Sequence, residues 1–129
     1  MSATNPTAVQ PRLVKAGVES EFPVGKMIIV ELERREIGVI RLRNGELRAI
    51  LNRCPHKGAP VCRGLLGGTW LPSTQPGQLE YARDGEVLVC PWHGFEFDLL
   101  TGAELYWTPP SRLRTFPVVV LDGDVLIGL

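Results

Sequence analysis

The chain has 129 residues, of which 44% are hydrophobic and 22% charged, and its 14 Lys and Arg balance its 14 Asp and Glu. This length predicts one domain with a modest core, and the zero formal net charge gives no sign of a nucleic-acid surface. No apolar run approaches the roughly 18 residues that a membrane-spanning helix needs.

The N-terminal stretch, residues 1–11, lacks the basic start and the apolar segment of a signal peptide. We therefore expect a flexible tail over 1–11 and a single domain over 12–129. The expected location is the cytoplasm, where thiols stay reduced. Three cysteines in such a chain argue against a disulfide framework and favour metal binding, reactivity or simple packing.

The first half of the domain is rich in β-branched residues. Residues 26–53 hold two or three β-rich runs, and Asn44-Gly45 is a dipeptide typical of a tight hairpin turn. A short helix over residues 30–37 competes with this interpretation. The β-branched residues that flank that stretch favour strands instead.

The second half repeats the pattern. Asp84-Gly85 and Asp122-Gly123 each lie between runs of Val, Ile and Leu, and each predicts a hairpin turn. The stretch 64–77 is rich in Gly and Pro and predicts an irregular loop. Eleven prolines and fourteen glycines disfavour long helices. The sequence therefore predicts an all-β fold built from antiparallel hairpins.

Both histidines of the chain stand close to a cysteine, just after a predicted strand. Cys54 and His56 lie in the stretch CPHKG, and Cys90 and His93 lie in the stretch CPWHG. Thiolate and imidazole together suit zinc and iron, and the proline after each cysteine restricts the loop. If the two strands lie in neighbouring hairpins, the loops converge and bring two thiols and two imidazoles to one metal site.

These two motifs resemble the Cys-x-His and Cys-x-x-His signature of Rieske iron–sulfur proteins, and the similarity covers about residues 27–129. The resemblance implies an antiparallel β-sandwich. It further implies a cluster-binding subdomain, about residues 52–106, that is formed by two ligand loops and inserted in the base β-sheets.

The resemblance also implies one [2Fe–2S] cluster per chain. In that family two cysteines hold one iron and two histidines hold the other, which assigns Cys54 and Cys90 to one iron and His56 and His93 to the other. The outer nitrogens of both histidines are then expected to face a docking partner. A structural Cys2His2 zinc site is the rival interpretation, although zinc sites usually pair Cys with Cys and His with His.

Departures from the respiratory members of this family indicate a subtype. Those proteins carry an extra cysteine in each loop and pair the two, whereas Trp92 stands in the second loop here and leaves Cys62 as a small buried hydrophobe. Phe95 and Phe97 replace the serine and tyrosine that donate hydrogen bonds to sulfur there. The resemblance is thus to the low-potential, oxygenase-associated ferredoxins, near the low end of a span of roughly −150 to +300 mV.

Two further stretches bear on docking. The segment between the loops, 57–89, is longer than in compact ferredoxins. It either shapes partner docking, with Trp70 as an anchor, or is a tolerated insertion. Residues 107–112 resemble the proline-rich third loop that covers the cluster in this fold, with Pro109 and Pro110 as its lid.

The sequence holds no nucleotide-binding fingerprint, and both histidines are already assigned to the cluster. The resemblance therefore implies a one-electron carrier rather than a complete catalyst. It would pass electrons from a flavin-dependent reductase to a terminal, ring-hydroxylating oxygenase or another redox enzyme. We expect a monomer with no nucleic-acid or membrane partner. A small subunit of a nitrite-reductase type of enzyme and a zinc-binding scaffold stay open as alternatives.

Overall fold

The computed structural model describes residues 12–56, 58–72, 79–92, 94–106 and 108–129. Within these ranges the chain forms ten strands and two 3-10 helices, and no helix there is long and apolar enough to cross a membrane. The all-β prediction is confirmed. The elements in chain order are β1 (Leu13–Val18), η1 (Glu19–Glu21), β2 (Ile28–Leu32), β3 (Arg35–Arg41), β4 (Leu47–Leu51), η2 (Val61–Arg63), β5 (Leu65–Pro72), β6 (Leu79–Val89), β7 (Glu96–Asp98), β8 (Thr115–Phe116), β9 (Val118–Leu121) and β10 (Asp124–Gly128).

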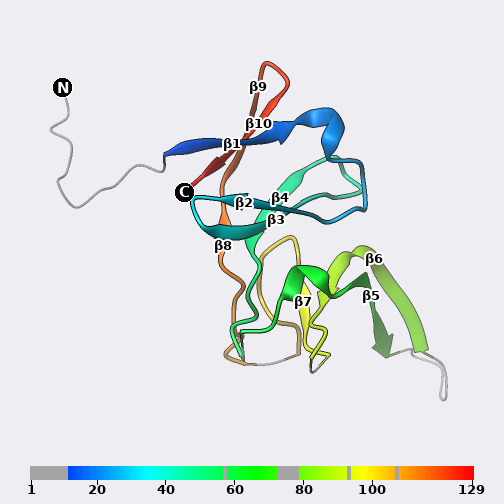
Figure 1. Cartoon of the computed structure of the whole chain (residues 1–129). Helices are drawn as coiled ribbons and strands as arrows, with labels where there is room; N and C mark the ends of the chain where they lie inside the picture. Colours follow the sequence, from blue (N-terminus) through cyan, green and yellow to red (C-terminus); the bar gives the residue numbers. More distant parts are fainter. Residues whose placement is uncertain (1–11, 57, 73–78, 93, 107) are drawn as a thin grey trace, which may run out of the picture.

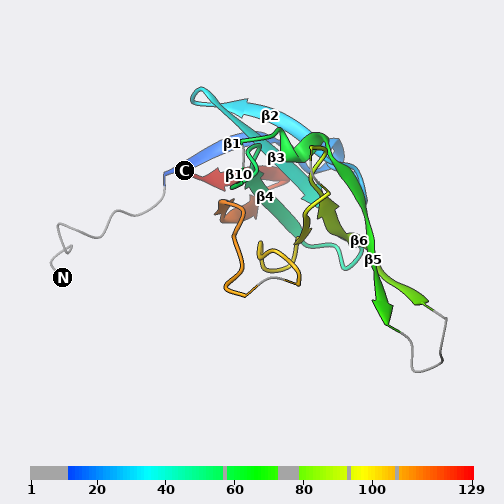
Figure 2. The ribbon, with the colours of Figure 1, turned by 90° about the horizontal axis from the view of Figure 1, so that it is seen from below.

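The strands form three antiparallel sheets. Two of them, with strand orders β1-β10-β9 and β2-β3-β4-β8, make up what we call the base sheets. The third, β5-β6-β7, lies beside the loops at the opposite end of the molecule (Figure 1). Figure 2 shows β5 and β6 extending away from the base as a long hairpin. The tail predicted over 1–11 lies outside the described residues, and the subdomain predicted over about 52–106 stays a prediction.

The first hairpin settles the choice between helix and strand over residues 30–37. Strands β2 and β3 pair in register from Ile28 with Val39 to Leu32 with Arg35. The two residues between them, Glu33-Arg34, have φ values of 50° and 68°. Left-handed conformations at both positions match the twist of a tight hairpin. Since neither residue is Gly or Asn, no turn signal in the sequence marks this hairpin.

Two of the three turns expected from the sequence are confirmed. At Asn44-Gly45 the chain reverses between β3 and β4, where the Leu42 amide donates to the Glu46 carbonyl at 2.8 Å. At Asp122-Gly123 it reverses between β9 and β10, which pair directly on either side of the turn. Both turns join strands of the base sheets.

The hairpin predicted at Asp84-Gly85 is wrong. That dipeptide lies inside β6, where β5 advances from Gly67 to Thr69 while its partner advances from Ala82 to Val87. The extra residues of β6 form a bulge, which needs left-handed residues as a turn does. The dipeptide signal therefore could not distinguish a bulge within one strand from a reversal between two strands.

The irregular loop predicted over 64–77 is also wrong for most of its length, because β5 begins at Leu65. Residues 73–78 lie outside the described ranges. Packing, rather than a loop, explains why a glycine, Gly64, precedes β5. A Cβ on Gly64 would lie 1.9 Å from the carbonyl oxygen of Val89 on β6. A glycine in or beside a strand often marks such a close backbone approach.

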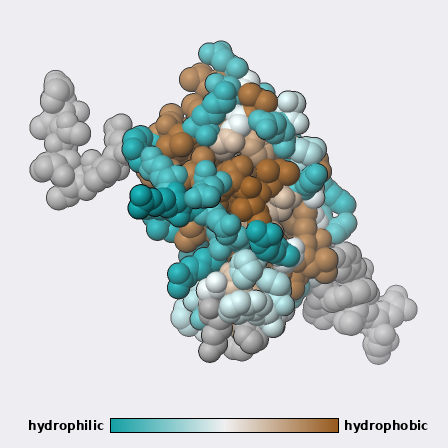
Figure 3. All heavy atoms as spheres, viewed as in Figure 1, coloured by the Kyte–Doolittle hydropathy of each residue, from teal (hydrophilic) through white to brown (hydrophobic). Residues whose placement is uncertain are grey.

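The core has two parts. One fills the base sheets around Phe22, Ile37 and Val39. The other includes all three cysteines and packs Leu88 and Phe97 of the third sheet against Ile40 and Ile50 of the base. In Figure 3 apolar side chains reach the surface over the base sheets, whereas the loop end is of intermediate hydropathy. The cysteines therefore lie where the third sheet packs on the base.

Replacing Gly64 with alanine is expected to destabilise the fold strongly. The new Cβ would meet backbone rather than a mobile side chain, so the loss in the free energy of unfolding should reach or exceed about 3 kcal/mol, the upper end for overpacking. Urea unfolding monitored by circular dichroism measures it. Gly45→Ala is the control, because its Cβ would meet nothing within 4 Å and only its φ of 89° is unfavourable, at about 1–2 kcal/mol. Equal losses in the two variants would contradict the close approach.

Candidate metal centre

The first ligand loop, residues 52–60, leaves the end of β4. The Cys54 amide donates to the Ala59 carbonyl at 2.7 Å, and the Gly58 amide donates back to the Cys54 carbonyl at 2.9 Å. Gly58 has a φ of 76°, in the left-handed region where glycine has no steric cost. These two bonds close the loop on its own cysteine.

The second ligand loop, residues 90–95, leaves the end of β6 and has the same frame. The Cys90 amide donates to the Phe95 carbonyl at 2.8 Å, and the Gly94 amide donates to the Cys90 carbonyl at 3.0 Å. Gly94 has a φ of 72°. In both loops, then, the cysteine amide donates to the carbonyl five residues later, and the amide of the glycine four residues later donates to the cysteine carbonyl. Cysteine, proline and glycine keep their places in CPHKG and CPWHG, and only the histidine shifts.

Both cysteines of these loops are buried, with 2% of their surface exposed. The Sγ atom of Cys54 lies 3.5 Å from Nδ1 of His56. The thiol and the inner ring nitrogen of the first loop therefore face each other. Among the described residues, which leave out His93, no three His, Cys, Asp or Glu side chains gather around one point as ligands of a single metal ion.

His56 also touches the second loop. Its ring stacks on Phe95, with ring centroids 3.8 Å apart and planes inclined by 14°, and it lies 6.0 Å from the ring of Phe97. The strands that carry the two loops belong to different sheets, rather than to neighbouring hairpins of one sheet. The loops nonetheless meet as expected, through this aromatic contact.

The outer nitrogen of His56 lies beside a buried carboxylate. Nε2 lies 3.1 Å from Oε2 of Glu104, whose side chain is only 3% exposed, while that of His56 is 23% exposed. That carboxylate oxygen accepts no hydrogen bond of good geometry, in spite of this separation. The expectation that both outer nitrogens face a partner thus does not hold for His56. No signal in the sequence pointed to Glu104, because it is far from His56 along the chain.

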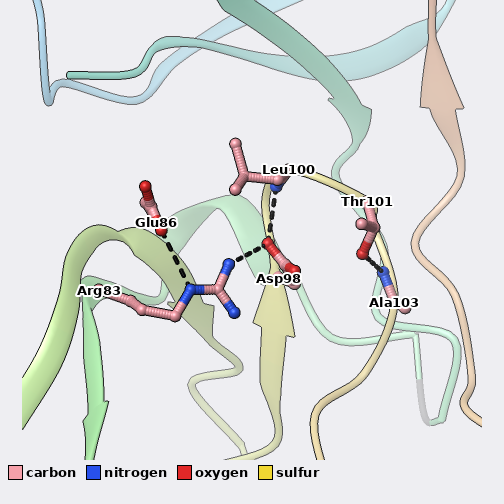
Figure 4. Close-up of polar contacts among 6 residues, drawn as sticks. All are labelled: Arg83, Glu86, Asp98, Leu100, Thr101 and Ala103. Atoms are coloured by element: carbon pink, nitrogen blue, oxygen red, sulfur yellow. Dashed lines mark hydrogen bonds and ion pairs between the residues drawn. The ribbon is translucent and has the colours of Figure 1, made fainter. Parts of the chain in front are cut away.

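A network of ions fixes the strands on either side of the second loop (Figure 4). Arg83, at the β6 bulge, donates from Nε to Glu86 at 3.0 Å and from a terminal nitrogen to Asp98 of β7 at 2.6 Å. The same Asp98 oxygen accepts the Leu100 amide at 2.9 Å. The hydrogen bond that Arg83 donates to Asp98 is the main cause that raises the pKa of Arg83. The bulge thereby anchors β6 to β7.

The residue just before the third loop, Tyr106, is joined to β5. The hydroxyls of Tyr106 and Thr69 are 2.7 Å apart, and Thr69 is buried. The peptide between Thr108 and Pro109 is cis. Pro109 is exposed and Pro110 half-buried, and their action as a lid stays a prediction. Trp107 and the side chain of Trp70 lie outside what the structure describes.

The family of the chain follows from one comparison. The model of the Rieske [2Fe-2S] domain matches residues 12–117, a span that includes both ligand loops. The chain belongs to the Rieske [2Fe–2S] domain family. The cofactor expected from the sequence, a [2Fe–2S] cluster, is confirmed by this membership.

Two relatives agree with this family assignment. The chain is 32% identical over 84 residues to the 3-phenylpropionate/cinnamic acid dioxygenase ferredoxin subunit of Photorhabdus laumondii, a match that covers 65% of each chain. It is 28% identical to the ferredoxin component of the naphthalene 1,2-dioxygenase system of Pseudomonas aeruginosa, over 84% of this chain and 88% of that protein.

Two solved structures show the same fold. A ferredoxin of Sphingomonas yanoikuyae B1 superposes with a TM-score of 0.67 at 25% identity, over 92% of this chain and 99% of that one. A protein described as the small subunit of an NADH-dependent nitrite reductase of Mycobacterium tuberculosis superposes with a TM-score of 0.69, over 95% and 97%. At 20% identity this second likeness shows the fold alone.

The residues present fit a Rieske cluster. Two buried thiols, an imidazole nitrogen turned toward one of them and two glycine-closed loops supply ligands of the right chemistry. A [2Fe–2S] cluster spreads its ligands over two irons, so the four donors need not surround one point. His93, the fourth expected ligand, lies outside the described residues.

Cys62, by contrast, is placed to pack. It is 5% exposed, and its amide donates to Oδ1 of Asn52 at 2.8 Å. A Cβ on Gly38 of β3 would lie 2.3 Å from its sulfur, which shows how closely the thiol approaches that strand. Burial raises the pKa of the Cys62 thiol to about 12 from 9.0.

We expect Cys62 to resist alkylation in the folded protein. A pKa higher by three units lowers the thiolate fraction near pH 8 about a thousandfold, and the thiolate is the reactive form. Its reactivity should rise only as the pH approaches 12 or when the chain unfolds. Peptide mapping after iodoacetamide treatment, with and without urea, measures labelling at this position. Rapid labelling of the folded protein at pH 8 would contradict the burial.

Proposed function

We propose that Cys54 and Cys90 bind one iron of the [2Fe–2S] cluster and that His56 and His93 bind the other. The matched backbone frame of the two ligand loops is the observation that carries this proposal, because it presents each cysteine in the same way from a different sheet. The position of Nδ1 of His56 beside the Cys54 thiol supports it further.

We further propose that the protein is the ferredoxin component of an oxygenase system. It accepts one electron at a time from a flavin-dependent reductase and passes it to a terminal, ring-hydroxylating oxygenase. The names of the Photorhabdus and Pseudomonas relatives support this role. One solved relative is a complex of oxygenase and ferredoxin from carbazole 1,9a-dioxygenase, which supports direct docking on an oxygenase. The cluster supplies one-electron exchange when bound.

The residues around the centre favour a low potential. Phe95 stacks on His56 and Phe97 is fully buried, and neither side chain can donate a hydrogen bond to sulfur. Hydrogen bonds to the sulfurs stabilise the reduced cluster and raise its potential. We place the protein near the low end of the Rieske range, suited to a ferredoxin that feeds an oxygenase.

The loop end offers a surface for docking. Trp92 is 56% exposed in the second ligand loop, between the exposed Pro91 and the proposed ligand His93. An aromatic side chain on a surface of intermediate hydropathy is typical of contact residues (Figure 3). We also propose that the protein acts in the cytoplasm as a monomer, consistent with a carrier that alternates between two partners.

One alternative keeps a specific observation in its favour. The likeness to the nitrite-reductase small subunit concerns the fold, and it covers nearly the whole of both chains. A permanent small subunit would co-purify with a large subunit in equal amounts, whereas a free carrier would purify alone. Size-exclusion chromatography of the protein from its source cells separates these two functions.

Substituting any proposed ligand should abolish the cluster. For Cys54→Ser, Cys90→Ser and His56→Ala we expect loss of the red-brown colour, loss of the reduced-state EPR signal and iron near zero per chain. Cys62→Ala is the matched control, since that thiol packs in the core, and it should retain about two irons per chain. Zinc in place of iron and sulfide in the wild-type protein would favour the scaffold alternative and contradict the proposal.

Replacing Trp92 with alanine should weaken transfer to the oxygenase. We expect the KM for the ferredoxin to rise about tenfold or more, as for a docking anchor worth above 1 kcal/mol, while the midpoint potential is unchanged. Leu121→Ala is the control, because Leu121 is 58% exposed on β9, at the opposite end of the molecule from the loops (Figure 1). Equal effects of the two substitutions in steady-state turnover with the partner oxygenase would contradict docking at the loop end.

A further inference from the structure

We propose that Glu104 is a positioning residue for the metal centre, which accepts the Nε2 hydrogen of His56 and so directs Nδ1 toward the cluster. This inference rests on the ligand role proposed above for His56. It adds to that role a specific residue outside both ligand loops.

The first observation is the contact itself. Oε2 of Glu104 lies 3.1 Å from Nε2 of His56, while Nδ1 on the other side of the ring lies 3.5 Å from the Cys54 sulfur. A neutral imidazole carries its hydrogen on one nitrogen and a lone pair on the other. A carboxylate at Nε2 favours the hydrogen there, which leaves the lone pair of Nδ1 for metal.

The second observation is the burial of the carboxylate. The Glu104 side chain is 3% exposed, and its Oε2 atom has no well-aligned hydrogen-bond donor. Leaving a buried carboxylate uncompensated costs several kcal/mol, so this oxygen requires a partner. The distance to Nε2 of His56 is already that of a hydrogen bond, although the alignment is not. Ligation through Nδ1 would fix the orientation of the ring.

The third observation is how firmly the backbone holds Glu104. Its amide donates to the Ser111 carbonyl at 2.8 Å, and the next amide, that of Leu105, donates to the Glu96 carbonyl at 2.8 Å. Glu104 also forms a bridge with Phe97 of β7. The backbone of Glu104 is therefore hydrogen-bonded between β7 and the third loop. A carboxylate fixed in this way costs little entropy when it orders the imidazole.

The arrangement has an electronic consequence. A carboxylate that accepts the outer N–H of a ligand histidine raises the basicity of the ring. A more basic imidazole stabilises the oxidised centre, so Glu104 lowers the reduction potential. Phe95 covers one face of the same ring at 3.8 Å. Stacking and the carboxylate together restrict His56 to one orientation.

Two substitutions separate this role from a simple effect of charge. Glu104→Asp keeps the charge but withdraws it from Nε2 by one methylene, whereas Glu104→Gln loses the charge but keeps an oxygen that can accept. We expect the Asp variant to favour reduction about tenfold, an upward shift of about 59 mV in midpoint potential for one electron, with altered g values. The Gln variant should shift less. Protein-film voltammetry and EPR of the cluster-loaded protein measure both.

Glu46→Gln is the control for net charge, because Glu46 is exposed and pairs with Arg48 on the base sheets, and its potential should equal that of the wild type. A shift in the midpoint potential of Glu104→Gln with none in Glu104→Asp would overturn the proposal in favour of a simple effect of charge. No shift in either Glu104 variant would overturn it outright. Glu104→Gln preserves the volume of the side chain and Glu104→Asp removes one methylene, so iron content and thermal unfolding check that the fold survives in both. A wild-type protein without iron would instead show that the proposed ligand set fails.

Discussion

The constraint on which the structure depends is the closure of each ligand loop on its own cysteine. The amide of Cys54 or Cys90 bonds to a carbonyl five residues on, and a left-handed glycine returns to the carbonyl of the same cysteine. This frame turns both thiols into the core and places His56 between the loops. The strands of two different sheets end where the loops begin, so the packing of the third sheet on the base sets the distance between them.

Local signals in the sequence predicted the turns correctly where a dipeptide marks a reversal of the chain. Asn44-Gly45 and Asp122-Gly123 do mark hairpins. Asp84-Gly85 does not, because a bulge held by Arg83 needs the same backbone conformations as a turn. The glycines before and within β5 indicate a loop when only the sequence is considered. For Gly64 the structure gives another reason, a close approach to the backbone of Val89, which is a contact between residues far apart in sequence.

The candidate site divides in the same way. Its cysteines and histidines stand out in the sequence, because residue type and spacing are local properties of CPHKG and CPWHG, and their role as the ligand set stays a prediction. The stacking of Phe95 on His56 and the approach of Glu104 to its outer nitrogen could not be predicted in this way, since both arise from how three separate loops pack. From the sequence, the one notable property of Phe95 is that it cannot donate a hydrogen bond to sulfur. In the structure its ring stacks on that of His56, a proposed ligand.

The attachment of the two ligand loops to different sheets also affects how the molecule unfolds. With the proposed ligands, the cluster joins Cys54, which follows β4 of the base, to Cys90, which follows β6 of the third sheet. It thus acts as a cross-link that closes a long stretch of chain and restricts the unfolded ensemble, as a metal clip does. The base and the third sheet then unfold as one cooperative unit in the loaded protein. Without the cluster this cross-link is lost, and among the described residues the shared core and the ion pair of Arg43 with Asp84 remain between them, so we expect the third sheet to open first.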